Sequence, residues 1–158
     1  DELLRKTAFF LLAIEELTDP GNFGTLIRTA AWFAVDAILA GSGCVSWHNP
    51  KTVRASMGPI FHVPIFEVPE LASFIRRAQQ HSTIYCADQN GDQPYDEIAS
   101  EPRKILLIGN ETAGWSDEMR AVADQRVVIP RSGTGESLNA AIAGAILMAE
   151  LCKNRTRK

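Results

Sequence analysis

The chain has 158 residues, of which 46% are hydrophobic and 22% are charged, and this composition is typical of one globular domain with its own buried core. Its formal net charge of −3 excludes a uniformly basic nucleic-acid binder but not a local basic face. The three cysteines (Cys44, Cys86 and Cys152) are too far apart in the sequence to encode a disulfide framework or a zinc site. No uncharged apolar run is long enough to cross a bilayer. We therefore expect a soluble, cytoplasmic protein with no metal and no membrane partner.

Short apolar runs that alternate with helical patterns predict an open α/β fold. The expected strands cover residues 9–14, 37–40, 63–67, 83–87, 105–108 and 126–129. The expected helices cover residues 25–33, 50–57, 71–80, 117–123 and 138–153. Because the strands are continuously apolar, we expect each to be buried on both faces of a parallel sheet flanked by helices. We expect the acidic stretch 88–97 to be a polar loop.

Residues that begin and end helices support two of these assignments. Asn49 is a suitable N-cap, Pro50 suits the first helical position, and Gly58 follows the expected end of that helix. Ser116 is the expected N-cap of the helix over residues 117–123. The last expected helix consists mostly of Ala, Ile, Leu and Met, which predicts close packing on the sheet.

Three segments place glycine, asparagine and hydroxyl residues directly after expected strands. They are residues 19–28, 109–114 and 129–139. In open α/β sheets, ligands bind at the carboxyl ends of the strands, and glycine allows a ligand to approach the main chain. Three such segments in one small sheet predict a composite pocket.

Two familiar phosphate-binding motifs fit these segments poorly. Residues 109–116 have the glycine spacing of a P-loop, but Trp115 stands where the lysine is required and Glu111 adds a negative charge. Neither Gly41-Ser42-Gly43 nor Gly133-Thr134-Gly135 continues into a dinucleotide-binding fingerprint. A pocket of backbone loops, apolar side chains and one carboxylate suits a cationic, partly apolar cofactor better than a phosphate.

Together, the three segments resemble the SpoU (TrmH-like) family of RNA 2′-O-ribose methyltransferases, within the SPOUT class. The similar motifs are Asn22-Phe23-Gly24-Thr25-Leu26-Ile27-Arg28, Gly109-Asn110-Glu111-Thr112-Ala113-Gly114, and Ile129-Pro130 followed by Glu136-Ser137-Leu138-Asn139. The intervening Asn49-Pro50-Lys51…Arg54-Ala55-Ser56-Met57-Gly58 is also similar. The motifs occur in the family's order and span nearly the whole chain.

The resemblance implies a deep C-terminal trefoil knot, a homodimer with the active site near the subunit interface, and S-adenosylmethionine bound in the knot. By the motif match, the cofactor site would include Leu107, Gly109, Asn110, Glu111, Gly114, Ile129, Ser137 and Leu138. The substrate would be a structured rRNA or tRNA.

The implied reaction is methyl transfer to a ribose 2′-hydroxyl, which must lose its proton. The catalytic residues carried over from the family are Arg28, Asn22, Glu111, Ser137 and Asn139. In the family the motif arginine is held to act in deprotonation. A guanidinium is normally a permanent donor, so a bidentate contact with a substrate phosphate is an equally open role for Arg28. The expected RNA-binding residues are Arg28, Lys51, Arg54 and Arg131.

Several roles stay open from the sequence. Lys51 and Arg54 form either a solvated face or a phosphate contact, and Ser137 and Asn139 either cap the last helix or contact ligand, or do both. The tryptophans either belong to the core or stack on a base, with Trp115 the best candidate for stacking. Arg131 replaces the Met that often follows Ile-Pro in the family.

Two other functions remain as alternatives: a SPOUT enzyme that methylates a base in tRNA, and a knotted RNA-binding module without turnover. Many relatives carry an N-terminal RNA-binding domain, whereas only a few residues precede the first expected strand here. We therefore expect one catalytic domain over residues 1–158. Either that further domain lies outside this chain, or the core binds RNA alone.

Overall fold

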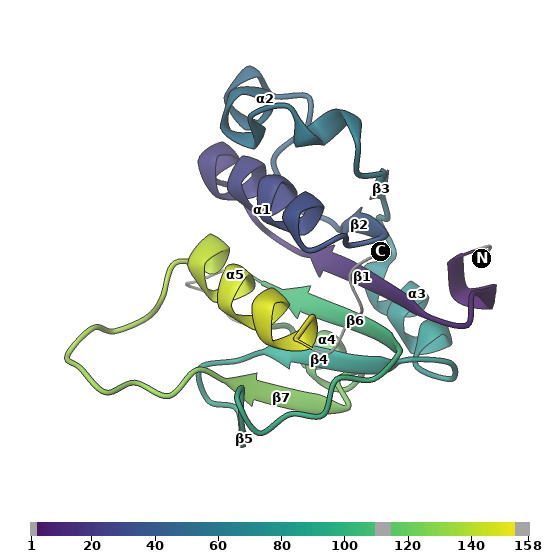
Figure 1. Ribbon diagram of the computed structural model, residues 1–158, viewed down its shortest axis with the longest axis vertical. Coiled ribbons are helices and arrows are strands. Elements are labelled where there is room, and N and C mark those ends of the chain that lie inside the picture. Colours follow the sequence, from purple (N-terminus) through teal and green to yellow (C-terminus); the bar gives the residue numbers. More distant parts are fainter. Residues whose placement is uncertain (1–2, 110–114, 154–158) are drawn as a thin grey trace.

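Seven parallel strands form the central sheet in the computed structural model of the chain, which describes residues 3–109 and 115–153 (Figure 1). The strands are β1 (Phe9–Ile14), β2 (Ala37–Ala40), β3 (Ile65–Glu67), β4 (Thr83–Ala87), β5 (Gln93–Pro94), β6 (Arg103–Ile108) and β7 (Gln125–Val128). Their order is β3-β2-β1-β6-β4-β7-β5, and every neighbouring pair is parallel. The predicted open parallel α/β sheet is confirmed.

Helices cover both faces of this sheet. They are α1 (Pro20–Trp32), α2 (Pro50–Ser56), α3 (Leu71–Ala78), α4 (Asp117–Arg120) and α5 (Ala140–Leu151), with short 3-10 helices at Leu3–Arg5 and Pro59–Phe61. Helices α1 and α5 lie beside one another on one face, while α3 and α4 lie on the other (Figure 1). No helix among the described residues has the length and apolar character needed to cross a membrane.

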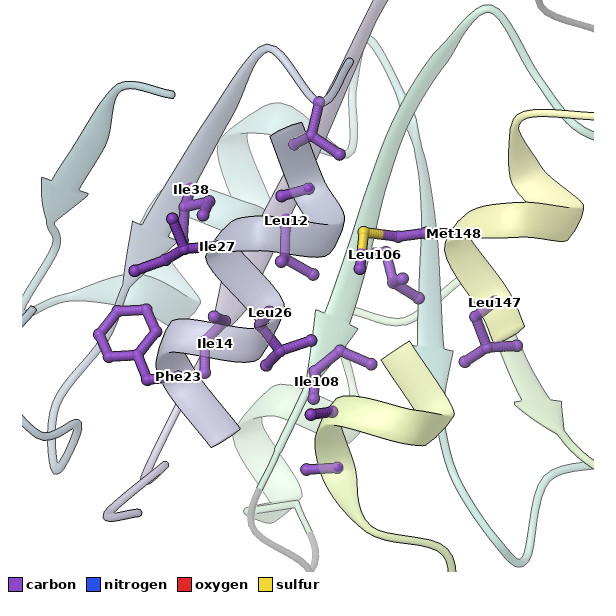
Figure 2. Packing of buried hydrophobic residues seen from close by; sticks show 14 of the residues in the cluster. Leu12, Ile14, Phe23, Leu26, Ile27, Ile38, Leu106, Ile108, Leu147 and Met148 are labelled. Carbon is purple, nitrogen blue, oxygen red and sulfur yellow. The ribbon is translucent and has the colours of Figure 1, made fainter. Parts of the chain in front are cut away.

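Alternate side chains of the strands divide the interior into two cores. Phe10, Leu12 and Ile14 of β1 point into the core beneath α1 and α5. Phe9 and Leu11 point into the core beneath α3 and α4. Figure 2 shows the first core, where side chains of β1, β6, α1 and α5 pack together. Burial on both faces explains why these strands are continuously apolar in the sequence.

The first helix begins earlier than the sequence predicted. Residues 20–24 were expected to be a loop, but they form the first turns of α1. The side chain of Asp19 accepts a hydrogen bond of 2.7 Å from the backbone of Asn22, and Pro20 takes the first helical position. An Asp-Pro pair is an N-terminal helix signal, and here it outweighs the two glycines. The first motif is therefore helical, and neither Gly21 nor Gly24 has a positive φ.

Other differences lie at the ends of elements. Strand β5 forms within the acidic stretch that was predicted to be a loop, where it pairs with β7 at the edge of the sheet. Helix α5 starts at Ala140, two residues after its predicted start, because Asn139 is the N-cap. Helices α2, α3, α4 and α5 end one to three residues before their predicted ends, and β3 starts at Ile65. Ser116 does cap α4, since its hydroxyl accepts a hydrogen bond from Met119.

Strand β6 also begins two residues earlier than predicted, because its lysine is buried. Lys104 is only 3% exposed, and its amine donates hydrogen bonds to the Ser100 hydroxyl and to the Leu151 carbonyl, the latter at 2.7 Å. The amine also lies 5.6 Å from the centre of the Phe10 ring. These contacts compensate the loss of water around the charge and attach the end of α5 to β6.

Helices α1 and α2 approach closely at Gly24. A Cβ atom at this position would lie 2.5 Å from both the Ala55 Cβ and the Thr52 carbonyl oxygen. Any larger residue would therefore push α2 away from α1. This contact matters for the site described below, because Gly24 lies between Asn22 and Arg28 on α1.

We predict that Gly24→Ala lowers the free energy of unfolding by about 1–3 kcal/mol, since the added methyl group overpacks a backbone contact. Urea denaturation would measure the change. Gly133→Ala is the matched control, because its Cβ would meet nothing within 4 Å and its φ is not positive. Equal stabilities of the two variants would contradict the proposed close approach.

Candidate active site

A pocket of about 1120 Å³ lies at the carboxyl ends of β4, β6 and β7. Register brings these ends together, since Cys86 of β4 pairs with Leu107 of β6 and Ala87 pairs with Val127 of β7. Apolar lining residues include Ala87, Ile108, Trp115, Val127, Ile129, Leu138, Ala140 and Leu147. Charged lining residues are Asp88, Arg120, Arg131 and Glu136. The pocket can therefore take a ligand that is partly apolar and carries charges of both signs.

The connection from β7 to α5 contributes most of one wall. Figure 1 shows this connection as a long loop between β7 and α5. Residues 129–133 and 135–138 line the pocket, and residues 131–138 are exposed. The Arg131 guanidinium donates a 2.8 Å hydrogen bond to the Gly135 carbonyl, which closes a turn within this connection. Residues expected to bind cofactor here, namely Ile129, Ser137 and Leu138, all line the pocket.

Trp115 forms another part of the lining and is a core residue. Its side chain is only 6% exposed, and its indole N–H donates a 2.9 Å hydrogen bond to the carbonyl of Ala87. The ring lies against Gly109, where an added Cβ would come within 2.9 Å of it. Trp115 thus connects the carboxyl ends of β4 and β6 from a largely buried position at the pocket wall.

Asp88 is a pocket residue that the sequence analysis did not single out. Its side chain is 8% exposed and pairs with Arg126 at 3.1 Å. The carboxylate also accepts a 2.9 Å hydrogen bond from the backbone of Asn90, which lines the pocket as well. The available signal was an Asp directly after a buried strand, at the edge where ligands bind.

One hydrogen bond joins the first and third motifs. The Asn139 amide donates to the Asn22 side-chain oxygen at 2.9 Å, although the residues are 117 positions apart in the sequence. The Asn139 oxygen accepts from the backbone of Ala141 and Ile142 and so caps α5. Asn139 therefore connects the start of α5, beside the pocket, with the first turn of α1.

The expected RNA-binding residues divide between two places. Arg28 is exposed on α1, and Lys51 and Arg54 are exposed on α2, which packs against α1. Only Arg131 of the four lines the pocket. Within the described part of the chain, no ion pair involves Arg28, Lys51 or Arg54.

The structure places Leu107 in the core beneath α3 and α4, fully buried and away from the pocket lining. Gly109 lines the pocket. The expected site residues Asn110, Glu111 and Gly114 lie outside the described residues. Among residues 3–109 and 115–153, no group of three His, Cys, Asp or Glu side chains is arranged to hold a metal ion.

Burial changes the acid–base properties of three groups near the carboxyl edge. Burial raises the pKa of the Cys86 thiol to about 12, with a smaller contribution from Asp88. Burial also raises the pKa of Cys44. The pKa of Glu15, which follows β1, is raised by burial and then by the charges of Glu16 and Glu118. The two thiols therefore stay protonated at neutral pH and are poor nucleophiles.

A family comparison matches the SpoU rRNA Methylase family over residues 10–149. The 23S rRNA (guanosine(2553)-2′-O)-methyltransferase RlmP of Bacillus subtilis is 38% identical over 92% of this chain and 58% of its own length. The 23S rRNA (uridine(2479)-2′-O)-methyltransferase of Streptomyces viridochromogenes is 30% identical over 98% of this chain and 56% of its own. The chain thus spans a little over half the length of these relatives.

Solved structures of methyltransferases are also similar to this chain. The SpoU methyltransferase AviRb of Streptomyces viridochromogenes, in complex with the cofactor AdoMet, has a TM-score of 0.87 and 31% identity. This similarity covers 98% of the present chain and 63% of AviRb. An AdoMet-bound rRNA methyltransferase from Sinorhizobium meliloti has a TM-score of 0.87 and 30% identity, over 94% of this chain and 57% of its own.

Because the Glu15 pKa is raised above its unfolded value of 4.5, the folded protein binds this proton more tightly than the unfolded chain does. The free energy of unfolding therefore falls as the pH rises through the raised pKa. We predict that Glu15→Gln is more stable than wild type at pH 7 and that this gain disappears below pH 4.5, where both chains have a neutral group. Urea denaturation across this pH range would measure the difference. Glu97→Gln, on an exposed loop, should show no comparable gain, and a less stable Glu15→Gln at pH 7 would contradict the prediction.

Proposed function

This chain belongs to the SpoU rRNA Methylase family, and we propose that it transfers a methyl group from S-adenosylmethionine to a ribose 2′-hydroxyl in structured rRNA or tRNA. The observation that carries this proposal is the hydrogen bond between Asn139 and Asn22. It joins the pocket that fits a cofactor to the helix that carries Arg28. The two named relatives described above act on 23S rRNA.

The chemistry of the pocket fits S-adenosylmethionine. Ile129, Leu138 and the main chain beside them offer apolar and hydrogen-bonding surface for the adenine ring. Asp88 and Arg131 offer opposite charges, which suit the ammonium and carboxylate groups of the methionyl part. When bound, the cofactor supplies a methyl group on a sulfonium, which an oxygen nucleophile attacks in line.

The polar residues of the motifs would hold the RNA against this pocket. A guanidinium group is a hydrogen-bond donor and never an acceptor, so we assign Arg28 to donating hydrogen bonds to the target nucleotide. Asn22 and Asn139 fix the start of α1 relative to α5, which sets the direction of the Arg28 side chain. By the family motif, Glu111 and Ser137 belong to the same set of polar residues. Ser137 lies on the pocket wall.

We further infer a homodimer, on the basis of exposed apolar residues on α1 and α5. Trp32 at the end of α1 is 84% exposed, and Ile142 near the start of α5 is 53% exposed. The two helices are neighbours on one face of the sheet. A second copy on this face would bury both side chains and lie close to the Asn22–Asn139 contact.

We infer also that the C-terminal part forms the family's trefoil knot. The chain reaches α5 from β7, which lies near one edge of the sheet. Helix α5 then contacts β4 and β6 and packs against α1. Ser100, in the connection that precedes β6, donates a hydrogen bond to the Leu151 carbonyl. That connection therefore lies against the end of α5, as expected for a helix that has passed through it.

The cofactor assignment is tested by calorimetric titration of the whole chain with S-adenosylmethionine, its demethylated product, ATP and NAD. We predict binding of the first two alone, and loss of that binding in Leu138→Glu, which puts a carboxylate on the pocket wall. Phe61→Glu, at an exposed apolar residue outside the pocket, is the matched control and should bind normally. A folded protein that binds neither methyl compound would instead favour an RNA-binding module without turnover.

The assignment of Arg28 is tested by methyl transfer to unmodified rRNA. We predict that Arg28→Ala lowers kcat by about 100-fold or more, while S-adenosylmethionine affinity stays unchanged because Arg28 does not line the pocket. Asn139→Asp should lower kcat too, since aspartate can still cap α5 but cannot donate to Asn22. Arg77→Ala on α3 is the control. A loss confined to KM would assign Arg28 to a phosphate, and no loss would remove it from the site.

A further inference from the structure

An aromatic pair lies in the connection between β2 and α2. The ring centres of Trp47 and His48 are 3.4 Å apart, and their planes are inclined by 31°. Trp47 is partly buried and packs against the core beneath α1 and α5, whereas His48 is exposed. One ring is thus supported by the protein, and the pair presents aromatic surface to solvent.

Hydrogen bonds hold this connection in one conformation. The backbone of Gly41 donates to Ile14 at 2.7 Å, and that of Val45 donates to Leu17 at 2.9 Å. These bonds join the connection to the segment that follows β1. A ligand that stacks on the pair would therefore lose little additional entropy in ordering the protein.

A turn next to the rings adds to this order. The Ser46 hydroxyl accepts a hydrogen bond from the His48 backbone at 3.2 Å, and the Ser46 carbonyl accepts one from Asn49 at 3.0 Å. Asn49 in turn caps α2 through its side chain. The positions of the two rings are therefore fixed relative to α2.

The pair lies on the side of the molecule where the proposed RNA-binding residues gather. The connection starts at the carboxyl end of β2, and Ala40 there is in register with Ile14 at the end of β1. The segment that follows β1 leads directly to Asn22 on α1. Lys51 and Arg54, four and seven positions after Trp47, are exposed and have no ion pair within the described residues.

We propose that the Trp47–His48 pair is a binding subsite for an unpaired nucleobase of the RNA substrate, next to the nucleotide that is methylated. Lys51 and Arg54 contact the phosphates that flank this base. Stacking on aromatic rings suits any base, because each has a π face, and it requires that the base be free of a duplex. The subsite rests on the proposed function, and it would make the enzyme select target nucleotides beside a loop or bulge.

The test measures binding of a short fluorescein-labelled oligoribonucleotide to the full chain by anisotropy, as a single strand and as a duplex. Trp47→Leu should weaken single-strand binding about 5- to 100-fold and duplex binding little. His48→Ala should weaken it to a smaller extent, and His48→Phe should restore it because the aromatic face returns. His81→Ala, at an exposed histidine two residues before β4, is the matched control.

Salt dependence separates stacking from a general disturbance of the loop. Stacking does not change the number of counterions that are released from the RNA on binding. Trp47→Leu and His48→Ala should therefore leave the slope of log affinity against log salt unchanged. Lys51→Gln should reduce that slope by about 0.7 for one phosphate contact on a single strand. A Trp47→Leu variant that also flattens the slope would mean that Lys51 and Arg54 had moved, which would overturn the stacking subsite.

Two further outcomes are decisive. If wild type binds the oligonucleotide and both aromatic variants bind it equally well, the subsite is wrong while the proposed function stands. If wild type binds S-adenosylmethionine but no RNA, both the subsite and the substrate assignment fail. Titration of the variants with S-adenosylmethionine confirms their folding, since neither ring lines the pocket.

Discussion

The parallel direction of all seven strands is the constraint from which the site follows. Each parallel strand must be reached by a crossover, so every strand delivers its carboxyl end to the same edge of the sheet. The register of β1 with β2 and β6 aligns Ile14, Ala40 and Ile108 at this edge. Segments that are far apart in the sequence therefore become neighbours there, and the pocket combines apolar side chains with charged and polar ones.

Hydrogen bonds hold helix α5 at both of its ends, and this fixes its position relative to the aligned strand ends. At its start, Asn139 caps the helix and donates to Asn22 of α1. At its end, Lys104 and Ser100 donate to the Leu151 carbonyl. Between these points, Gly144 allows close contact, since an added Cβ would lie 2.6 Å from Leu26 of α1. Removing the Lys104 amine from water is costly, and its hydrogen bonds compensate part of this cost. The position of α5 therefore depends on these hydrogen bonds to a charged group as well as on apolar packing.

The sequence predicts the sheet well because strands buried on both faces leave continuous apolar runs, and six of the seven strands lie where such runs were found. It predicts poorly where a polar residue is buried with a distant partner. Lys104 lies just before the strand predicted over residues 105–108, whereas it is inside β6 and donates a hydrogen bond to Leu151 of α5. Residues 20–24 had the composition of a loop, yet Asp19 and Pro20 start a helix whose glycine is needed for contact with α2. The motifs name Asn22 and Asn139, but no local pattern shows that their side chains bond to each other. The sequence placed Leu107 in the cofactor site. Successive side chains of a strand point to opposite faces of the sheet, and that of Leu107 points into the core beneath α3 and α4.

The distribution of charge is compatible with the RNA binding proposed for a chain of net charge −3. In the described part of the chain, carboxylates pair with Lys6, Arg76, Arg126 and Lys153, all away from the exposed face of α1 and α2. Among the described residues, no carboxylate pairs with Arg28, Lys51 or Arg54, so a phosphate that binds there displaces none of these carboxylates. Gly24 decides how near these cations lie to one another, because it sets the distance between the two helices. The same close contact positions the Trp47–His48 pair beside them, since Thr52 of α2 also bonds to Ser46 in the preceding connection. The small size of Gly24 thus allows the close packing of α1 and α2. This packing in turn sets the distances between the cations and the aromatic pair that a bound RNA strand would contact.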